Sequence, residues 1–158
     1  MAWSNRSKWT DDDAALAERL REEVADKPLD YVRHDSNARL DEALRRVVIE
    51  NGIGYLGLWW VLVECLCSKR GHVYDVSDDT GWMQLAMDMS TCGYMVEPDL
   101  CRAFVSTLAE AGLVNAELLA EKGHVANDRV LKECWKYADA CAVKKVSGIV
   151  SGRMRRQG

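Results

Sequence analysis

The stretch that decides the fold is residues 80–128, which read TGWMQLAMDMSTCGYMVEPDLCRAFVSTLAEAGLVNAELLAEKGHVAND. Apolar residues at helical spacing predict a helix that begins near Thr80: Trp82, Leu85, Ala86 and Met89. After a turn over residues 90–95, Pro98 suits the first position of a second helix, and Gly112 suits its end. The stretch therefore predicts two helices, Thr80–Met89 and Pro98–Ala111, joined by a turn.

Two short strands are expected directly after these helices. Leu113–Leu119 and His124–Arg129 flank Glu121-Lys122-Gly123, which is a hairpin signal. Two helices joined by a turn and followed by a hairpin form the pattern of a winged helix-turn-helix. In that arrangement the second helix occupies the recognition position, and the wing tip lies near Lys122.

Helices are also expected on both sides of this stretch. Thr10 before three aspartates predicts the start of a helix that ends near Pro28. Two further helices are predicted at 40–51 and 54–68, a short strand at Val73-Tyr74, and a last helix from Val130, with Ser147–Gly158 frayed. The expected fold class is α+β and mostly α, with a helical extension at 1–29, a winged-helix domain at 30–132, and a C-terminal helix and basic tail at 133–158.

Composition and cysteine usage bound the class of protein. The 158 residues are 48% hydrophobic and 29% charged, as in ordinary globular domains. The N-terminus shows no secretory pattern, and the longest apolar run, Ile53–Cys67, is shorter than the ~20 residues that cross a bilayer. We therefore expect a cytoplasmic protein, with no membrane partner. The six cysteines include no C-x-x-C pair, which predicts reduced core thiols and no metal site.

Charge is unevenly distributed along the chain. The formal net charge is -4, but residues 129–158 hold eight basic residues against two acidic ones. Such asymmetry is typical of a segment that binds a polyanion. It is equally typical of a solvated helix end, because lysine and arginine are stabilised near the negative pole of a helix. The sequence leaves both interpretations open.

Sequence patterns of enzymes are weak in this chain. Gly52-Ile53-Gly54-Tyr55-Leu56-Gly57 matches G-x-G-x-x-G, but the preceding residues belong to a helical stripe and not to a strand, so a turn between helices is expected. His34 and Asp35 could be a base and its orienter, although a helix start capped by Asp35 or Ser36 is favoured. Glu64, inside an apolar helix, is expected to form an ion pair or reach the surface. We expect neither catalysis nor a cofactor.

Two motifs carry a resemblance to a known family. H-D-S-N-A-R-L-D-E at 34–42 and G-L-W-W-V-L-V-E-C-L at 57–66 resemble the N-terminal winged-helix domain of phage and prophage replisome-organiser proteins, the DnaD-like group. Ala111–Val114, Asn127–Leu131 and the basic end at 142–156 extend the similarity over about residues 30–156. The resemblance implies an association with DNA replication initiation. In that family the winged-helix part often assembles subunits, while DNA binding is associated with a second domain.

The function expected from these observations is DNA binding by a winged helix in phage or mobile-element replication. Residues from the recognition-position helix, the wing and the tail are the expected DNA contacts: Arg102, Ser106, Thr107, Lys122, His124, Lys144, Lys145, Arg153, Arg155 and Arg156. The alternative is a module that binds replication proteins or itself through an apolar face around Trp3, Trp9 and the N-terminal helix. Asp99 and Glu110 on the recognition-position helix oppose phosphate and keep this alternative open.

Overall fold

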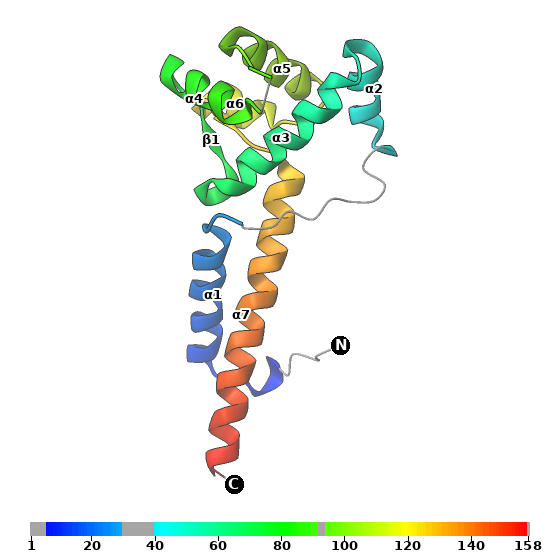
Figure 1. Ribbon diagram of the computed structural model, residues 1–158. Coiled ribbons are helices and arrows are strands. Elements are labelled where there is room, and N and C mark those ends of the chain that lie inside the picture. Colours follow the sequence, from blue (N-terminus) through cyan, green and yellow to red (C-terminus); the bar gives the residue numbers. More distant parts are fainter. Residues whose placement is uncertain (1–5, 30–39, 92–93, 158) are drawn as a thin grey trace. The chain divides into compact units, whose positions relative to one another are not determined.

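The computed structural model describes residues 6–29, 40–91 and 94–157, and they form a mostly helical α+β fold with one small sheet. Its elements are η1 (Arg6–Lys8), α1 (Asp11–Ala25), α2 (Glu42–Asn51), α3 (Gly54–Ser68), η3 (Arg70–His72), β1 (Tyr74–Asp75), α4 (Asp79–Met89), α5 (Pro98–Glu110), α6 (Ala116–Lys122), β2 (His124–Val125) and α7 (Asp128–Gln157) (Figure 1). They divide into two compact units. Unit 1 comprises residues 1–27 and 132–158, and unit 2 comprises residues 28–131.

The core of unit 2 is built around α3, the most apolar helix of the chain. Seven of its fifteen residues are buried, and Leu62 and Leu66 have no exposed surface. The buried face of α5 meets the same core through Cys101, Phe104, Val105 and Leu108. Glu64 is not part of this core. It lies on the exposed side of α3, and its carboxylate reaches solvent. Burial of apolar area is therefore the main force that assembles unit 2.

The two helices expected at 80–89 and 98–111 are present as α4 and α5. Asp78 caps α4 by accepting a hydrogen bond from the backbone N–H of Gly81, and Pro98 is at the first turn of α5. The turn between them is held by Ser90, whose Oγ donates to the carbonyl of Ala86 and accepts from the N–H of Val96. Gly112, at φ +76°, ends α5 in the left-handed region that favours glycine.

The wing hairpin predicted after α5 is wrong. Residues 116–122 form the helix α6, and β2 pairs in antiparallel fashion with β1, in the register Tyr74–Val125 and Asp75–His124. Asn115 starts α6 by accepting from the N–H of Leu118, and Gly123 ends it at φ +64°. The segment A-E-L-L-A-E-K between these caps consists of strong helix formers, which outweighed the weak strand pattern.

The glycine-rich stretch at 52–57 joins two helices, as expected. Gly52, at φ +95°, ends α2, and α3 begins at Gly54, so no strand precedes the motif. This arrangement contradicts a dinucleotide fingerprint, which requires a strand before the first glycine.

Helix α2 begins at Glu42 and is capped by Asp41, so Leu40 stands before the helix and is exposed. The predicted roles of His34, Asp35 and Ser36, the motif at 34–39, Trp3 and Cys92 fall outside the described residues.

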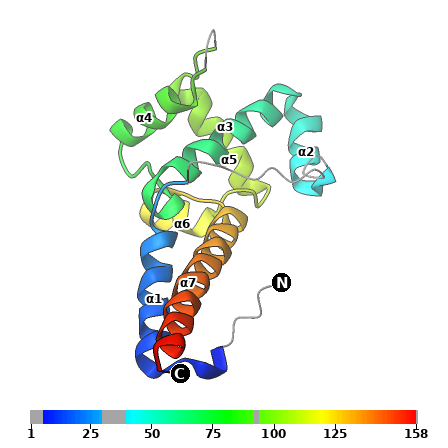
Figure 2. The same cartoon turned by 60° about the horizontal axis from the view of Figure 1, so that its bottom comes forward.

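Unit 1 consists of η1, α1 and the C-terminal part of α7. Helices α1 and α7 pack side by side and run in opposite directions (Figures 1 and 2). Leu20 of α1 and Ala142, Val146 and Val150 of α7 form its core, with Trp9 packed beside them. The prediction that residues 147–158 are frayed is wrong, because α7 continues to Gln157. Contacts with α1 and Trp9 bury one side of this polar segment and keep it helical.

Gly81 tests the packing of α4 on β1. A Cβ at this helical position would lie 2.5 Å from the carbonyl oxygen of Asp75 and 2.8 Å from Cα of Val76. We expect Gly81→Ala to lower the free energy of unfolding by about 1–3 kcal/mol, as overpacking does, although alanine is normally the better helix former. Gly148→Ala, with open space around it, should raise stability by up to about 1 kcal/mol. Urea denaturation measures both, and a stabilised Gly81→Ala variant would contradict the close approach.

Candidate nucleic-acid interface

The recognition-position helix α5 exposes few groups that can attract DNA. Arg102 donates to Asp79 at 2.5 Å and stacks over the ring of Trp82 at 4.8 Å, so its charge is already engaged by α4. Thr107 donates its hydroxyl to the carbonyl of Ala103, whereas Ser106 is exposed. Of the three predicted contacts on α5, only Ser106 presents an uncommitted group to solvent.

The surroundings of α5 are acidic. Residues 73–121 contain nine acidic side chains and one basic side chain, Arg102. Asp79, although paired with Arg102, keeps 94% of its side chain exposed, and Asp99 is exposed on α5 itself. Since phosphate neutralisation by lysine and arginine supplies most of the affinity for DNA, this surface opposes DNA binding.

Lys122 and His124 were predicted at the tip of a wing hairpin, but they lie in two other elements. Lys122 is the exposed last residue of α6, and His124 is the first residue of β2. His124 pairs with Asp75 across the sheet. The pKa of the Asp75 carboxyl lies below its usual value because it accepts from the backbone and side chain of Ser77, with the charge of His124 contributing as well. His124 is therefore opposed by a carboxylate in its own sheet.

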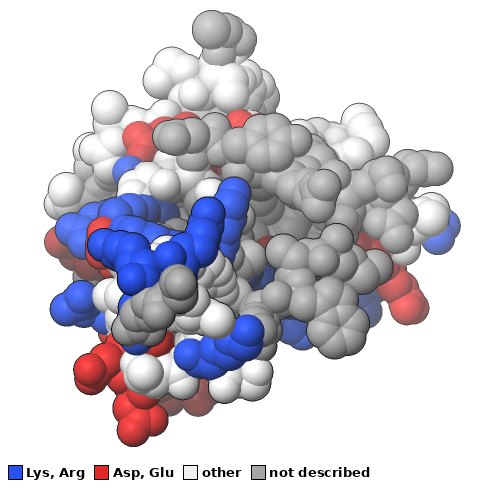
Figure 3. Space-filling model, turned by 90° about the horizontal axis from the view of Figure 1, so that it is seen from below, with Lys and Arg blue, Asp and Glu red and all other residues white. Residues whose placement is uncertain are grey.

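Helix α7 brings four of the five predicted tail residues to one exposed face. At 100° per residue, Lys144, Lys145, Arg155 and Arg156 lie within about 120° of the helix circumference. All four are exposed, and residues 140–158 contain no acidic side chain. We call these four residues the α7 basic face. Figure 3 shows lysine and arginine side chains gathered on the end of the molecule at which α7 terminates.

Small residues separate the two halves of the α7 basic face. Gly148, Ser151 and Gly152 lie between the lysine pair and the arginine pair on the same side of the helix. Lys144 and Arg155 are eleven positions apart, which corresponds to about 16 Å along the helix axis. Because the side chains between the two pairs are small, a phosphate backbone can approach the helix closely there. The cations then bind the phosphate backbone on either side of this small-residue segment.

The fifth tail residue, Arg153, points to α1 and not to the basic face. It donates to Asp13, whose side chain is only 6% exposed. Asp13 also accepts from the backbone N–H and the hydroxyl of Thr10, completing the N-terminal cap of α1. The backbone hydrogen bond from Thr10, assisted by Arg153, holds the pKa of Asp13 below its usual value. Arg153, which the sequence predicted as a DNA contact, thus forms an ion pair within unit 1.

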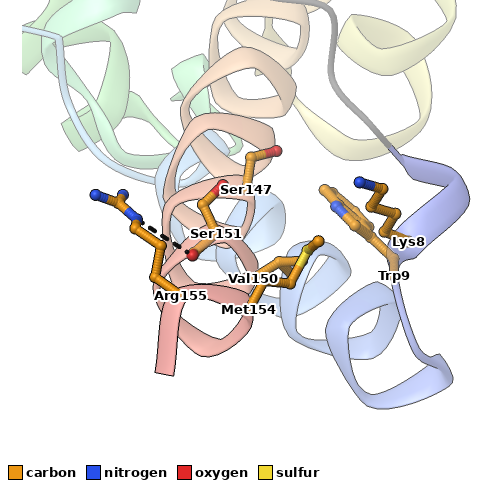
Figure 4. A pocket seen from close by; sticks show the side chains of 7 residues that line it. All are labelled: Lys8, Trp9, Ser147, Val150, Ser151, Met154 and Arg155. Carbon is orange, nitrogen blue, oxygen red and sulfur yellow. Dashed lines mark hydrogen bonds between the residues drawn. The ribbon is translucent and has the colours of Figure 1, made fainter. Parts of the chain in front are cut away.

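A pocket of about 330 Å³ adjoins the α7 basic face within unit 1 (Figure 4). Its lining combines two cations, two hydroxyls, an aromatic ring and two aliphatic side chains: Lys8, Arg155, Ser147, Ser151, Trp9, Val150 and Met154. Lys8, Ser147 and Ser151 are not among the DNA contacts expected from the sequence. The signal available was Ser147 and Ser151 at helical spacing in the basic segment, but only tertiary packing brings Lys8 and Trp9 to them.

The described cysteines are structural. Cys65, Cys67, Cys101 and Cys134 are buried thiols that form no disulfide with one another, and Cys141 is half-buried. Burial raises the pKa of both Cys65 and Cys101 to about 11, so these thiols stay protonated and unreactive at neutral pH. Among the described residues, no group of three or more metal-ligating side chains gathers at one place.

Comparisons with protein-family models, curated proteins and solved structures found no match for this chain. Within the described part of the chain, every helix is too short or too polar to cross a membrane.

The Asp13–Arg153 pair predicts a pH dependence of unit 1. Because the pKa of Asp13 is lowered on folding, its stabilising contribution is full above the unfolded value near 3.8 and is lost as the pH falls through the lower folded value. Asp13→Asn should therefore reduce the melting temperature at pH 7 and make it less sensitive to acidification below about pH 4. Far-UV circular dichroism between pH 2 and 7 measures this.

Asp12→Asn is the matched control for this measurement, because Asp12 is exposed in the same first turn of α1. We expect its acid sensitivity to follow the unsubstituted protein. Identical profiles for the Asp12 and Asp13 variants would contradict a special role for the ion pair.

Proposed function

We propose that this protein binds DNA in a replication process of phage or mobile-element type, and that the α7 basic face makes the principal contact. The observation that carries the proposal is the gathering of four exposed cations on one side of a helix that contains no acidic side chain after Asp139. Each such cation can neutralise a phosphate and release a condensed counterion, which favours binding to any DNA sequence. The proposal assigns the chain no catalytic role.

The replication context is supported by the resemblance of residues 34–42 and 57–66 to replisome organisers. The order of α4, turn, α5 and a small antiparallel sheet is also compatible with a winged-helix type of domain. In this proposal α6 stands in place of the wing hairpin. Helix α5 is not the DNA-reading element, because its exposed surface is acidic and Arg102 is engaged by Asp79.

The salt dependence of binding measures the number of phosphates contacted. Four contacts predict a slope of about -3.6 for the logarithm of the association constant against the logarithm of salt concentration. The double variant Lys144→Ala/Lys145→Ala removes two contacts, so the slope should fall to about -1.8. Fluorescence anisotropy of a labelled duplex, titrated between 50 and 200 mM salt, gives these values.

The matched control is Lys132→Ala/Lys136→Ala, which removes the same charge from an exposed part of α7 outside the basic face. Arg102→Ala is the corresponding control on α5. Both should keep the slope and the affinity of the unsubstituted protein within about twofold. Salt-insensitive binding, or an equal loss of affinity in the control variants, would contradict the assignment of DNA binding to the α7 basic face.

A second candidate function, protein binding by unit 2, is favoured by a separate surface. Met83 and Met87 are exposed by 56% and 66% on one side of α4, and Met95, in the turn before α5, is exposed by 77%. Methionine adapts to varied partner shapes, and the same helix, α4, carries the exposed acidic residues Asp79 and Asp88. A basic amphipathic helix of a partner protein matches both properties.

This second function is tested with a labelled 18-residue peptide of leucine and lysine arranged as an amphipathic helix, and with its leucine–glutamate counterpart. The lysine peptide should bind, and Met83→Ser/Met87→Ser should weaken it several-fold. Ile49→Ser/Ile53→Ser removes two exposed apolar side chains elsewhere in unit 2 and should have no effect. Equal binding of both peptides, or no binding, would contradict the proposed partner chemistry.

A further inference from the structure

The pocket beside the α7 basic face has the chemistry of an anion site next to an aromatic wall. Lys8 and Arg155 supply two positive charges, and none of the described residues that line the pocket is acidic. Arg155 uses one N–H to donate to the backbone carbonyl of Ser151, which leaves the rest of its guanidinium for another acceptor. Trp9 forms the opposite wall, facing α7 from the segment that follows η1 (Figure 4).

One polar atom in this lining lacks a partner among the described residues. The hydroxyl oxygen of Ser147 is buried and makes no hydrogen bond in that part of the chain. A buried hydroxyl without a partner is unfavourable, so an acceptor supplied by a bound molecule would improve its environment. Ser147, Lys8 and Arg155 together favour a ligand that carries both an anionic group and further hydrogen-bonding atoms.

The size of the pocket restricts that ligand. A volume of about 330 Å³ lies at the low end of the range for small-molecule sites and admits a unit the size of one nucleotide. A base paired and stacked within a duplex cannot enter such a hollow, whereas an unpaired base can. Trp9, with Val150 and Met154 beside it, provides the apolar and aromatic contacts on which a base packs.

The pocket and the α7 basic face share residues. Arg155 belongs to both, and Ser151 lies between the two cationic pairs of the face while lining the pocket. A strand whose phosphates follow the α7 basic face therefore passes the opening of the pocket. This continuity favours a nucleotide within a strand over a free mononucleotide.

We propose that the pocket holds one unpaired nucleotide of single-stranded DNA, with its base against Trp9 and its phosphate beside Lys8, while Arg155, which points away from Lys8 and Trp9 in Figure 4, binds a neighbouring phosphate of the same strand. This inference rests on the proposed DNA-binding function and deepens it. It makes single-stranded DNA the preferred ligand of unit 1, with the α7 basic face holding the phosphates on either side of the inserted base.

The experiment compares labelled oligothymidylate of twelve nucleotides with a duplex of the same length, using the full chain. Single-stranded DNA should bind more tightly than the duplex. Trp9→Ala should weaken single-strand binding about tenfold, as loss of base–aromatic stacking does, while duplex binding changes less than twofold. Trp9→Phe should retain most of the single-strand affinity, because phenylalanine preserves an aromatic wall.

A second variant guards against unfolding, since Trp9 also packs against the core of unit 1. Lys8 is exposed, so Lys8→Ala preserves the core and should still reduce single-strand affinity several-fold. Lys132→Ala removes the same charge from an exposed position of α7 outside the basic face and should have no effect. Circular dichroism melting verifies that each variant is folded.

The possible outcomes separate the inference from the function on which it rests. Duplex binding with no single-strand preference, unchanged in the Trp9 and Lys8 variants, would overturn the pocket and leave the α7 basic face intact. If deoxyadenosine monophosphate competes as strongly as the oligonucleotide, the ligand of the pocket is a free nucleotide and not a nucleotide within a strand. That result would also overturn the inference. Failure to bind either form of DNA at low salt would overturn both proposals.

Discussion

Packing of α1 against the C-terminal part of α7 is the interaction on which the candidate interface depends. Residues 144–156 include two glycines and two serines, and such a segment is marginally helical by itself. Val146 and Val150 are buried beside α1 and Trp9, and Arg153 binds Asp13. These contacts hold the segment in helical form, and only a helix places Lys144, Lys145, Arg155 and Arg156 on one side. The same packing places Lys8 and Trp9 next to Ser147 and thereby creates the pocket.

Segregation of charge gives the two units different capacities. Unit 1 carries twelve basic against nine acidic residues, whereas unit 2 carries nine against sixteen. Within unit 1 several acidic side chains are paired internally, as Asp13 is with Arg153 and Asp139 with Arg6 and Arg21, so the exposed end of α7 remains basic. In unit 2 the surface of α4 and α5 combines carboxylates with exposed methionines. The proposed partners differ accordingly: a nucleic acid for α7 and a basic helix for α4 and α5.

Local signals in the sequence predicted the elements whose ends are marked by caps. Thr10, Pro98 and Gly112 lie at helix boundaries, because the hydrogen-bonding and backbone properties that mark a cap are local. The prediction of a strand over 113–119 was wrong, although local cap signals for a helix were present there as well. Asn115 and Gly123 were available as cap signals for α6, but Glu121-Lys122-Gly123 was interpreted as the turn of a hairpin. The pairing of β2 with β1 joins residues about fifty positions apart, and no local pattern indicates it.

The sequence by itself determined the helical character of the chain, the two helices around Pro98, the apolar α3 and the concentration of positive charge near the C-terminus. Each of these follows from spacing or composition within a short window. Tertiary structure decided which of those charges remain available. Arg153 and Arg102 carry the same charge as their exposed neighbours, yet Asp13 and Asp79 engage them, because folding brings together carboxylates and guanidiniums distant in the sequence. Folding likewise turned a tail expected to fray into a helix with a defined basic face.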